Sequence, residues 1–194
     1  RHRSVSRGLG DVYKRQAKTY LYPQPVLIIS TYGEDGSPDA MNAAWGGICD
    51  YNKVMLCLSE GHKTYKNILA RKAFVINIAD AANVVACDYV GMVSGNNVPD
   101  KMAKTGWKLA KSSFVDAPVV EDLKLALECR LDKIDEDGLV IGEIVNVSAD
   151  ESVIKDGKID PSLLQPITFD AVNNKYLVLG EVVGNAFADG KKLS

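Results

Sequence analysis

The sequence is poor in the side chains that bind metals. Its 194 residues include two histidines and four cysteines, and no two cysteines form a Cys-x-x-Cys pair. Structural zinc sites need four such ligands at short, regular spacings, so we expect no metal site. Cys57 and Cys129 lie in apolar strand patterns and are predicted to be small buried hydrophobes. We expect Cys49 to be a buried structural thiol, with a redox role as the alternative, and all four thiols to be reduced in a cytoplasmic protein.

Charge of one sign and long apolar runs are also missing. Lysine and arginine number 23 against 25 aspartates and glutamates, which gives a formal net charge of −2. Without a basic excess, nucleic acid is not the expected partner. The longest apolar stretch, residues 25–30, falls far short of the ~20 residues that span a membrane, so we expect no membrane partner. Hydrophobic residues make up 46% of the chain, which is enough for one globular domain with its own core.

The common catalytic motifs are absent as well. No Gly-x-Gly-x-x-Gly loop precedes a helix, which argues against a Rossmann-type nucleotide domain. His62 is the only histidine beyond residue 16, so the chain offers no Ser-His-Asp or Cys-His arrangement. We therefore expect no catalytic side chain.

Residues 1–16 are basic and carry no apolar period or signal-peptide core. Residues 6–16 resemble translated adaptor or vector sequence, and a natural flexible tail is the alternative. We expect residues 1–16 to be a non-native or disordered leader and residues 17–194 to form a single domain.

The first half predicts strands and a helix. Residues 26–32 are rich in β-branched side chains, and the Asp-Gly pair within residues 34–38 is typical of a hairpin turn. Residues 41–47 would form the return strand and residues 54–58 a third strand. A helix over residues 62–71 is then predicted, with Ser59 as the candidate N-cap and Tyr65, Ile68 and Leu69 on its apolar side.

The middle of the chain continues with a strand over residues 73–78, and Asn77 is predicted to end it. A helix over residues 80–90 follows, with its apolar side formed by Ala81, Val84, Val85 and Tyr89. Residues 91–98 read as a loop, and residues 100–107 as a short helix ended by Gly106.

The second half is predicted to be mostly β. Apolar and polar residues alternate along residues 123–134, the pattern of a half-buried strand, and residues 139–148 return as its hairpin partner. Residues 166–170 and 176–180 are short final strands. Antiparallel hairpins with inserted helices favour a mainly β, Greek-key-like fold, closed or partly closed into a small barrel.

Residues 39–67 carry the most informative chemistry. His62, Lys63 and Thr64 stand at a predicted helix start, where free N–H groups and the helix dipole favour an anion. The alternative is an ordinary helix cap with a solvated lysine. Upstream, residues 41–47 are small and polar where a buried strand would be apolar, and Gly46 and Gly47 indicate a bulge or a close approach. This stretch favours a site for a flat, anionic cofactor.

Several short motifs, from about residue 20 to the C-terminus, carry a family resemblance. Each is weak alone, but their order and spacing are specific. They are Pro25-Val26, the segment 39–45, Ser59-Glu60 with Thr64 and Asn67, the segment 74–77, Ser94-Gly95 with Asp100-Lys101, and the segments 165–167 and 176–184. The sequence resembles the flavin reductase-like, flavoredoxin-type family of FMN-binding split barrels.

The resemblance implies a split-barrel homodimer that binds FMN non-covalently. Lys63 and Thr64 would contact the phosphate, with Ser59 nearby, and Asn42 would reach the pyrimidine edge or ribityl hydroxyls. Trp45 would wall the ring pocket or, alternatively, pack in the barrel core. The cluster around Ser94 would contact the flavin or else form a surface loop before a helix cap. The expected cofactor-binding residues are Met41, Asn42, Ala43, Ala44, Trp45, Ser59, His62, Lys63, Thr64, Asn67, Ser94, Gly95 and Lys101.

Three functions follow as expectations. The first is an oxidoreductase that takes hydride from NADH or NADPH and passes electrons through FMN to free flavin, an iron complex or another acceptor. The second is a non-enzymatic FMN carrier reduced by a partner protein. The third is a cofactor-free barrel that serves as a binding module. Because the flavin itself performs the redox chemistry, neither of the first two needs an acid–base pair from the protein.

Overall fold

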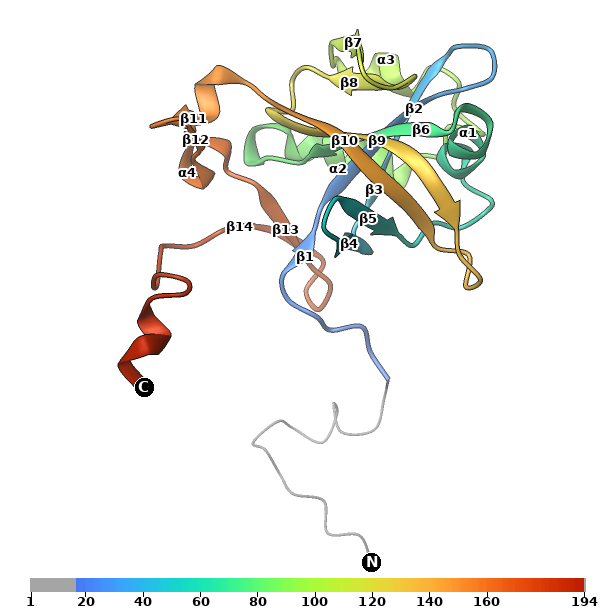
Figure 1. Cartoon of the computed structure of the whole chain (residues 1–194). Coiled ribbons are helices and arrows are strands. Elements are labelled where there is room, and N and C mark those ends of the chain that lie inside the picture. The colour runs from blue at the N-terminus through green and yellow to red at the C-terminus, as the bar shows by residue number, and fades with distance from the viewer. Residues whose placement is uncertain (1–16, 194) are drawn as a thin grey trace, which may run out of the picture.

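The computed structural model describes residues 17–193, and within them the chain is mainly β. The prediction for residues 1–16 lies outside these described residues. Seven strands form one curled antiparallel sheet in the order β3-β2-β6-β9-β10-β5-β4 (Figure 1). The prediction of a mainly β, partly closed barrel with inserted helices is confirmed. The strands are β2 (Leu27–Tyr32), β3 (Pro38–Ala43), β4 (Gly46–Asp50), β5 (Lys53–Leu56), β6 (Ala73–Ile78), β9 (Leu125–Ile134) and β10 (Val140–Ala149).

Smaller sheets and helices surround this half-barrel. A three-stranded sheet joins β1 (Gln24–Pro25), β13 (Ile167–Asp170) and β14 (Lys175–Val178), and beyond β14 the chain leaves the body as an extended arm (Figure 1). Two hairpins pair β7 (Leu109–Lys111) with β8 (Pro118–Val120) and β11 (Ile154–Lys155) with β12 (Lys158–Ile159). The helices are α1 (Lys63–Arg71), α2 (Val84–Met92), α3 (Lys101–Thr105) and α4 (Pro161–Leu164).

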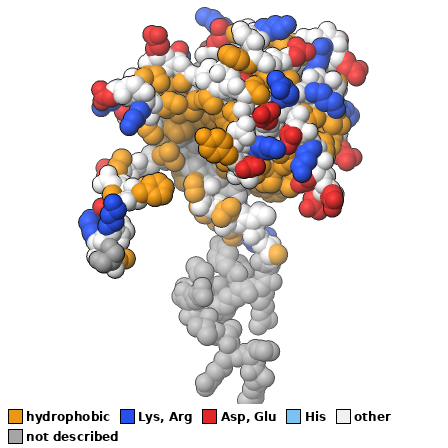
Figure 2. Space-filling model, in the orientation of Figure 1, with side chains coloured by type: hydrophobic (Ala, Val, Ile, Leu, Met, Phe, Trp, Pro, Cys, Tyr) orange, Lys and Arg blue, Asp and Glu red, His pale blue; other side chains and the backbone are white. Residues whose placement is uncertain are grey.

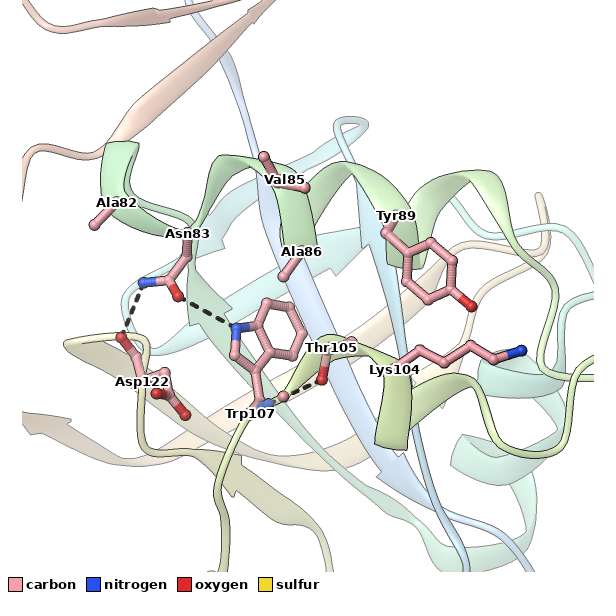
Figure 3. Close-up of a pocket in the computed structure, with 10 residues that line it drawn as sticks. Ala82, Asn83, Val85, Ala86, Tyr89, Lys104, Thr105, Trp107 and Asp122 are labelled. Carbon is pink, nitrogen blue, oxygen red and sulfur yellow. Dashed lines mark hydrogen bonds between the residues drawn. The ribbon is translucent and has the colours of Figure 1, made fainter.

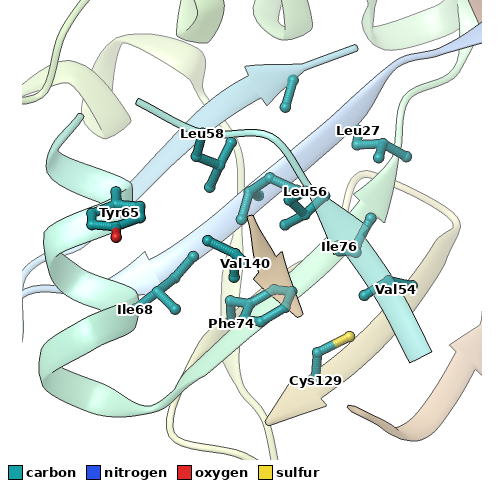
Figure 4. Close-up of a cluster of buried hydrophobic side chains, with 12 residues drawn as sticks. Leu27, Val54, Leu56, Leu58, Tyr65, Ile68, Phe74, Ile76, Cys129 and Val140 are labelled. Carbon is teal, nitrogen blue, oxygen red and sulfur yellow. The ribbon is translucent and has the colours of Figure 1, made fainter. Parts of the chain in front are cut away.

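Strand β2 lies between two hydrophobic cores. Ile29 belongs to the core inside the curl of the sheet, which α1 closes with Tyr65 and Ile68 (Figure 4). The neighbouring Ile28 belongs to a second core, on the opposite face, together with Val90 of α2. Both isoleucines are fully buried. A strand covered on both faces favours apolar residues at consecutive positions, which explains the unbroken apolar run over residues 26–29.

The predicted return strand is interrupted within residues 41–47. The chain bends at Ala44 and Trp45, so β3 ends at Ala43 and β4 begins at Gly46. These two strands lie at opposite edges of the seven-stranded sheet, which brings the edges together at this corner. A side chain at Gly46 would collide there, because its Cβ would lie 2.8 Å from Leu56 Cδ2 and 3.1 Å from Leu27 Cδ1. Gly46 therefore marks the close approach at the curl of the barrel, whereas a Cβ at Gly47 would meet nothing within 4 Å.

Helix α1 lies where the sequence places it, but its start differs. The N-cap is His62 in extended conformation rather than Ser59, and no side chain caps the first turn. Tyr65 and Ile68 are buried as expected, whereas Leu69 is exposed. The helix ends at Arg71, and the C-cap residue Lys72 adopts the left-handed conformation.

Helix α2 begins with a 3₁₀ turn over Ala81–Asn83, which Asp80 caps by accepting a hydrogen bond from the Asn83 N–H. The helix then continues to Met92, so the first two residues of the predicted loop are helical. The side chains that it buries are Cys87 and Val90, while Val85 is 81% exposed. The predicted inclusion of Val85 in the buried side is therefore wrong.

The thiols divide into two pairs. Cys87 and Cys129 are fully buried, and burial raises the pKa of each to about 12. Cys49, on the edge strand β4, and Cys57, just after β5, are exposed. The predictions of a buried Cys49 and a buried Cys57 are therefore wrong. All four cysteines are free thiols.

Strand β9 is covered more fully than its alternating pattern predicts. Leu127 and Cys129 face the inner core, as the alternation implies. On the opposite face Glu128 is also buried, because the loop that follows β7 folds over it. Its carboxylate accepts hydrogen bonds from the hydroxyl of Ser112, from Asn146 Nδ2 at 2.6 Å and from Ser148 Oγ at 3.3 Å.

Asn77 links three segments rather than ending a strand. Its Nδ2 donates to the Ile28 carbonyl at 3.0 Å and to Ser30 Oγ at 2.8 Å, and its Oδ1 accepts from the Val120 N–H at 2.9 Å. We expect Asn77→Ala to destabilise the protein by about 2–3 kcal/mol in urea denaturation, because it orphans buried polar groups. The exposed Asn97→Ala is the control and should change stability by less than ~0.5 kcal/mol. Equal effects of the two variants would refute this role.

Within residues 17–193, no helix is long and apolar enough to cross a membrane. In the same residues, no three His, Cys, Asp or Glu side chains come together in an arrangement that would hold a metal ion.

Candidate functional site

A small pocket of about 150 Å³ lies where the start of α1 meets β3 and the end of α2. Seven of the thirteen predicted site residues line it, although they come from four separate segments. These seven are Met41, His62, Lys63, Thr64, Ser94, Gly95 and Lys101; the remaining lining residues are Asp39, Val90, Gly91, Met92 and Val93.

Asp39 organises the floor of this pocket. Its side chain is almost fully buried, accepting a hydrogen bond from Thr64 Oγ1 at 3.0 Å through Oδ2. Its other oxygen, Oδ1, lies 3.9 Å from Lys101 Nζ, and both side chains of this ion pair are 3% exposed. One carboxylate therefore holds a residue of α1 and a residue of α3 against β3.

The two lysines of the pocket differ in their surroundings. Burial lowers the pKa of Lys101. The Asp39 carboxylate acts in the opposite direction and raises this pKa, whereas the positive charge of Lys63 lowers it further. Lys63 is partly exposed, and in residues 17–193 no carboxylate lies within ion-pair distance of it. Because Asp39 balances Lys101, Lys63 supplies the net positive charge of the pocket.

The first turn of α1 adds a second attraction for an anion. A helix start leaves N–H groups without intrahelical acceptors and carries a partial positive charge. In α1 no side chain caps these groups and no acidic residue stands in the first turn. Thr64 is part of this turn, but its hydroxyl already donates to Asp39, so its backbone N–H is the group left to meet a ligand.

Gly95 allows the loop after α2 to close over the pocket. A Cβ at this position would lie 2.2 Å from Asp39 Oδ1 and 3.0 Å from Lys63 Cδ. Any side chain there would displace Asp39 or Lys63. The loop can therefore approach Asp39 and Lys63 this closely only because residue 95 is a glycine.

Except for Met41, the residues predicted to hold a flat ring lie outside this pocket. Asn42 uses its Nδ2 within the fold, donating to the Cys87 carbonyl at 3.0 Å and to the Tyr176 hydroxyl at 3.5 Å. Only its Oδ1 is left to accept from a ligand. Ala43 is buried in the inner core and Ala44 is partly buried at the corner. Trp45 is 54% exposed, so the alternative that it packs in the barrel core is wrong.

The two other predicted residues also lie apart. Ser59 is exposed, and its carbonyl accepts from the His62 N–H at 3.0 Å. Asn67 is buried and donates through Nδ2 to Thr31 Oγ1 at 3.0 Å, which ties α1 to β2. It also lines an open hollow next to Lys63 and Lys66. Asn67 therefore makes a structural contact, and neither Asn67 nor Ser59 lines the pocket.

Sequence reasoning missed two parts of the pocket. The sequence assigns no role to Asp39. Asp39, Lys63 and Lys101 lie in separate segments of the sequence, and only the fold brings them together in one pocket. The sequence predicts only the end of a helix and a loop for the segment from Val90 to Val93. No local signal showed that the end of α2 would face the start of α1.

A second, larger hollow of about 440 Å³ lies between α2 and the segment after α3 (Figure 3). None of the predicted site residues lines it. Its central side chain, Trp107, donates through Nε1 to Asn83 Oδ1 at 3.3 Å, and Asn83 Nδ2 donates to the Asp122 carbonyl at 3.1 Å. These hydrogen bonds join the two walls of the hollow, so we assign it a structural role.

The fold and the pocket together define the class of protein: a split β-barrel with an uncapped helix start and two lysines beside its curl. A model of the flavin reductase-like domain matches residues 19–185, which is most of the chain. The chain therefore belongs to the flavin reductase-like family, and its function is of the flavin-binding oxidoreductase type.

Several other proteins are similar to this chain over most of their length. Flavoredoxin of Desulfovibrio vulgaris (Miyazaki F) is 37% identical with a TM-score of 0.87, over 90% of this chain and 96% of that one. The FMN-binding domain of a flavin reductase-like enzyme from Shewanella baltica has a TM-score of 0.75 at 23% identity, over 84% and 89% of the two chains, which shows the shared fold. An uncharacterized protein of Archaeoglobus fulgidus is 30% identical over 146 residues, covering 73% of this chain and 80% of its own.

Proposed function

We propose that residues 17–194 act as one domain that binds FMN non-covalently, takes hydride from NADH or NADPH, and passes electrons to a flavin, an iron complex or another acceptor. The observation that carries the proposal is the pocket at the start of α1, where Lys63, Lys101 and an uncapped helix N-terminus converge. This donor set suits the phosphate of FMN.

The pocket's size supports a phosphate rather than a ring. Its volume of about 150 Å³ is well below the ~300–1,000 Å³ of pockets that enclose whole ligands. The flavin ring would therefore extend past the pocket, toward the exposed corner at Ala44 and Trp45. Asn42 Oδ1 would accept a hydrogen bond on that side, and Met41 and Met92 would supply apolar surface near the phosphate end.

The chain's own residues bind and orient in this proposal. When bound, FMN supplies the hydride and single-electron chemistry. Lys63 and the first-turn N–H groups of α1 hold the phosphate, Asp39 keeps Lys101 and Thr64 in place, and Gly95 lets the loop close. His62 and Ser94 border the phosphate, while Ser59 and Asn67 support the start of α1 from outside the pocket.

A second candidate is a non-enzymatic FMN electron carrier that a partner protein reduces. The 37% identity to a flavoredoxin favours it. Both candidates use the same cofactor site, so they differ only in the electron donor.

We also propose a homodimer. The ring side of the site is exposed in the single chain, at Trp45 and along β4, so a second copy would supply the missing wall. An obligate interface of this kind buries more than ~2,000 Å² in total. A monomer at micromolar concentration that still binds FMN would contradict this part of the proposal.

Anaerobic stopped-flow spectroscopy tests the proposed activity. The purified protein should take up FMN and show bound-flavin absorbance, and mixing with NADH or NADPH should bleach it at a rate that saturates with nucleotide. Steady-state oxidation of the nucleotide with added free flavin should follow. Bleaching by neither nucleotide would favour the carrier, and failure to take up FMN would leave a cofactor-free binding module.

A further inference from the structure

The C-terminal arm, residues 177–188, exposes apolar side chains to an unusual extent. Val182 is 92% exposed and Val183 and Phe187 are each 100% exposed, while Leu177, Val178 and Leu179 are 44–54% exposed. The arm begins with the last two residues of β14 and then runs away from the body of the molecule (Figure 1). The chain therefore leaves Val182, Val183 and Phe187 uncovered and covers only about half of each of the other three side chains.

The composition of the arm is that of an interface core. Across residues 177–188, Glu181 is the only charged side chain, whereas 25% of the whole chain is charged. Charged residues return only at Asp189, where a 3₁₀ helix over Asp189–Leu193 ends the described chain. Depletion of charge in a continuous apolar segment distinguishes interface cores from ordinary surface.

The barrel offers an uncovered apolar surface of its own. Ile48 pairs with the buried Val54, and Val147 pairs with Leu127 of the inner core. Directly opposed residues of antiparallel strands share a face, so both side chains continue the inner core. Yet Ile48 is 67% and Val147 52% exposed. Figure 2 shows hydrophobic side chains gathered in a hollow between the body and the arm.

We infer that the arm of each chain packs on the barrel of a second copy, so that two arms are exchanged across a twofold axis. The inference rests on the proposed homodimer and adds the segment that forms it. Both surfaces belong to one chain, as an isologous interface requires. The six apolar side chains expose on the order of 800 Å², which matches what each partner contributes to a standard interface.

Point variants in the full chain test the exchange. In sedimentation equilibrium at about 10 µM, the wild-type protein should have twice the chain mass of 21.0 kDa. The double variant Val183→Glu, Phe187→Glu should weaken the dimer by at least ~100-fold, since it buries two charges at the centre of the interface. The control, Val85→Glu, changes an equally exposed valine on α2 and should dimerise like the wild type.

The readouts separate the arm from the rest of the proposal. Circular dichroism should show both variants folded, because the arm contributes nothing to either core. A wild-type dimer whose dissociation constant is unchanged by the double variant overturns the arm exchange. A monomeric wild type overturns it together with the homodimer. FMN uptake is measured in parallel: a dimer that requires the arm but takes up no FMN would refute the cofactor and leave the exchange standing.

Discussion

Lys63→Glu should weaken FMN binding by about 100-fold, a loss of about 3 kcal/mol. The change removes the one cation of the pocket that no carboxylate balances and places a negative charge beside the phosphate. It also puts an acid at the start of α1, which favours the helix itself and so should not unfold it. Titration of FMN into the apoprotein, followed by flavin fluorescence, measures the effect.

Lys66→Glu is the matched control. Lys66 lies on the same helix, is exposed, and lines the neighbouring hollow rather than the pocket. It should change the dissociation constant by no more than ~3-fold, because solvent and salt screen a charge at that position. If the two variants bind FMN equally well, the phosphate does not lie at the start of α1. If both variants lose FMN affinity equally, FMN is attracted by the overall positive charge of this surface and not by a specific contact with Lys63.

Asp39→Leu should have the largest effect on stability, about 3–5 kcal/mol. The substitution leaves the Lys101 ammonium buried without its partner and takes away the acceptor of the Thr64 hydroxyl. The double variant Asp39→Leu, Lys101→Met replaces the ion pair by apolar side chains and should recover most of the loss. Urea denaturation of the wild type, both single variants and the double variant gives the coupling energy.

Additive losses in that cycle would mean that Asp39 and Lys101 act independently, in spite of the 3.9 Å between them. If Asp39→Leu alone lowers the free energy of unfolding by less than ~1 kcal/mol, the contacts of Asp39 with Lys101 and Thr64 contribute little to stability. The recovered double variant is also informative about the ligand: with Lys63 intact, it should still bind FMN, but more weakly, because the floor of the pocket is no longer fixed.

The sequence predicted the strands and helices well where their signal is local. The apolar run at residues 26–32, the Asp-Gly hairpin and the long alternating strand each encode their own structure. The family resemblance, confirmed by the domain match, supplied the fold as a whole. Of the site, the segments around Lys63 and Ser94 were predicted separately, and the fold brings them into one pocket.

The errors arise where a neighbour decides the outcome. Residues 41–47 look like one strand because no local rule shows that Ala43 pairs with β2 while Gly46 pairs with β5. Cys57 follows an apolar pattern but extends past the end of its strand, into solvent. Asp39 is an ordinary polar residue after a turn until Lys101, sixty-two positions away, comes to lie beside it.

The double burial of β2 also affects how the molecule comes apart. Ile28 and Ile29 anchor one strand in both cores, and Thr31, further along, holds α1 through Asn67. Neither core can open without withdrawing this strand from the other, so the two behave as one cooperative unit. Asp39 pairs with Thr31 across the hairpin, which ties the pocket to that unit. A ligand held at the start of α1 therefore opposes global unfolding rather than a local fluctuation, and its full binding free energy is added to the stability of the barrel.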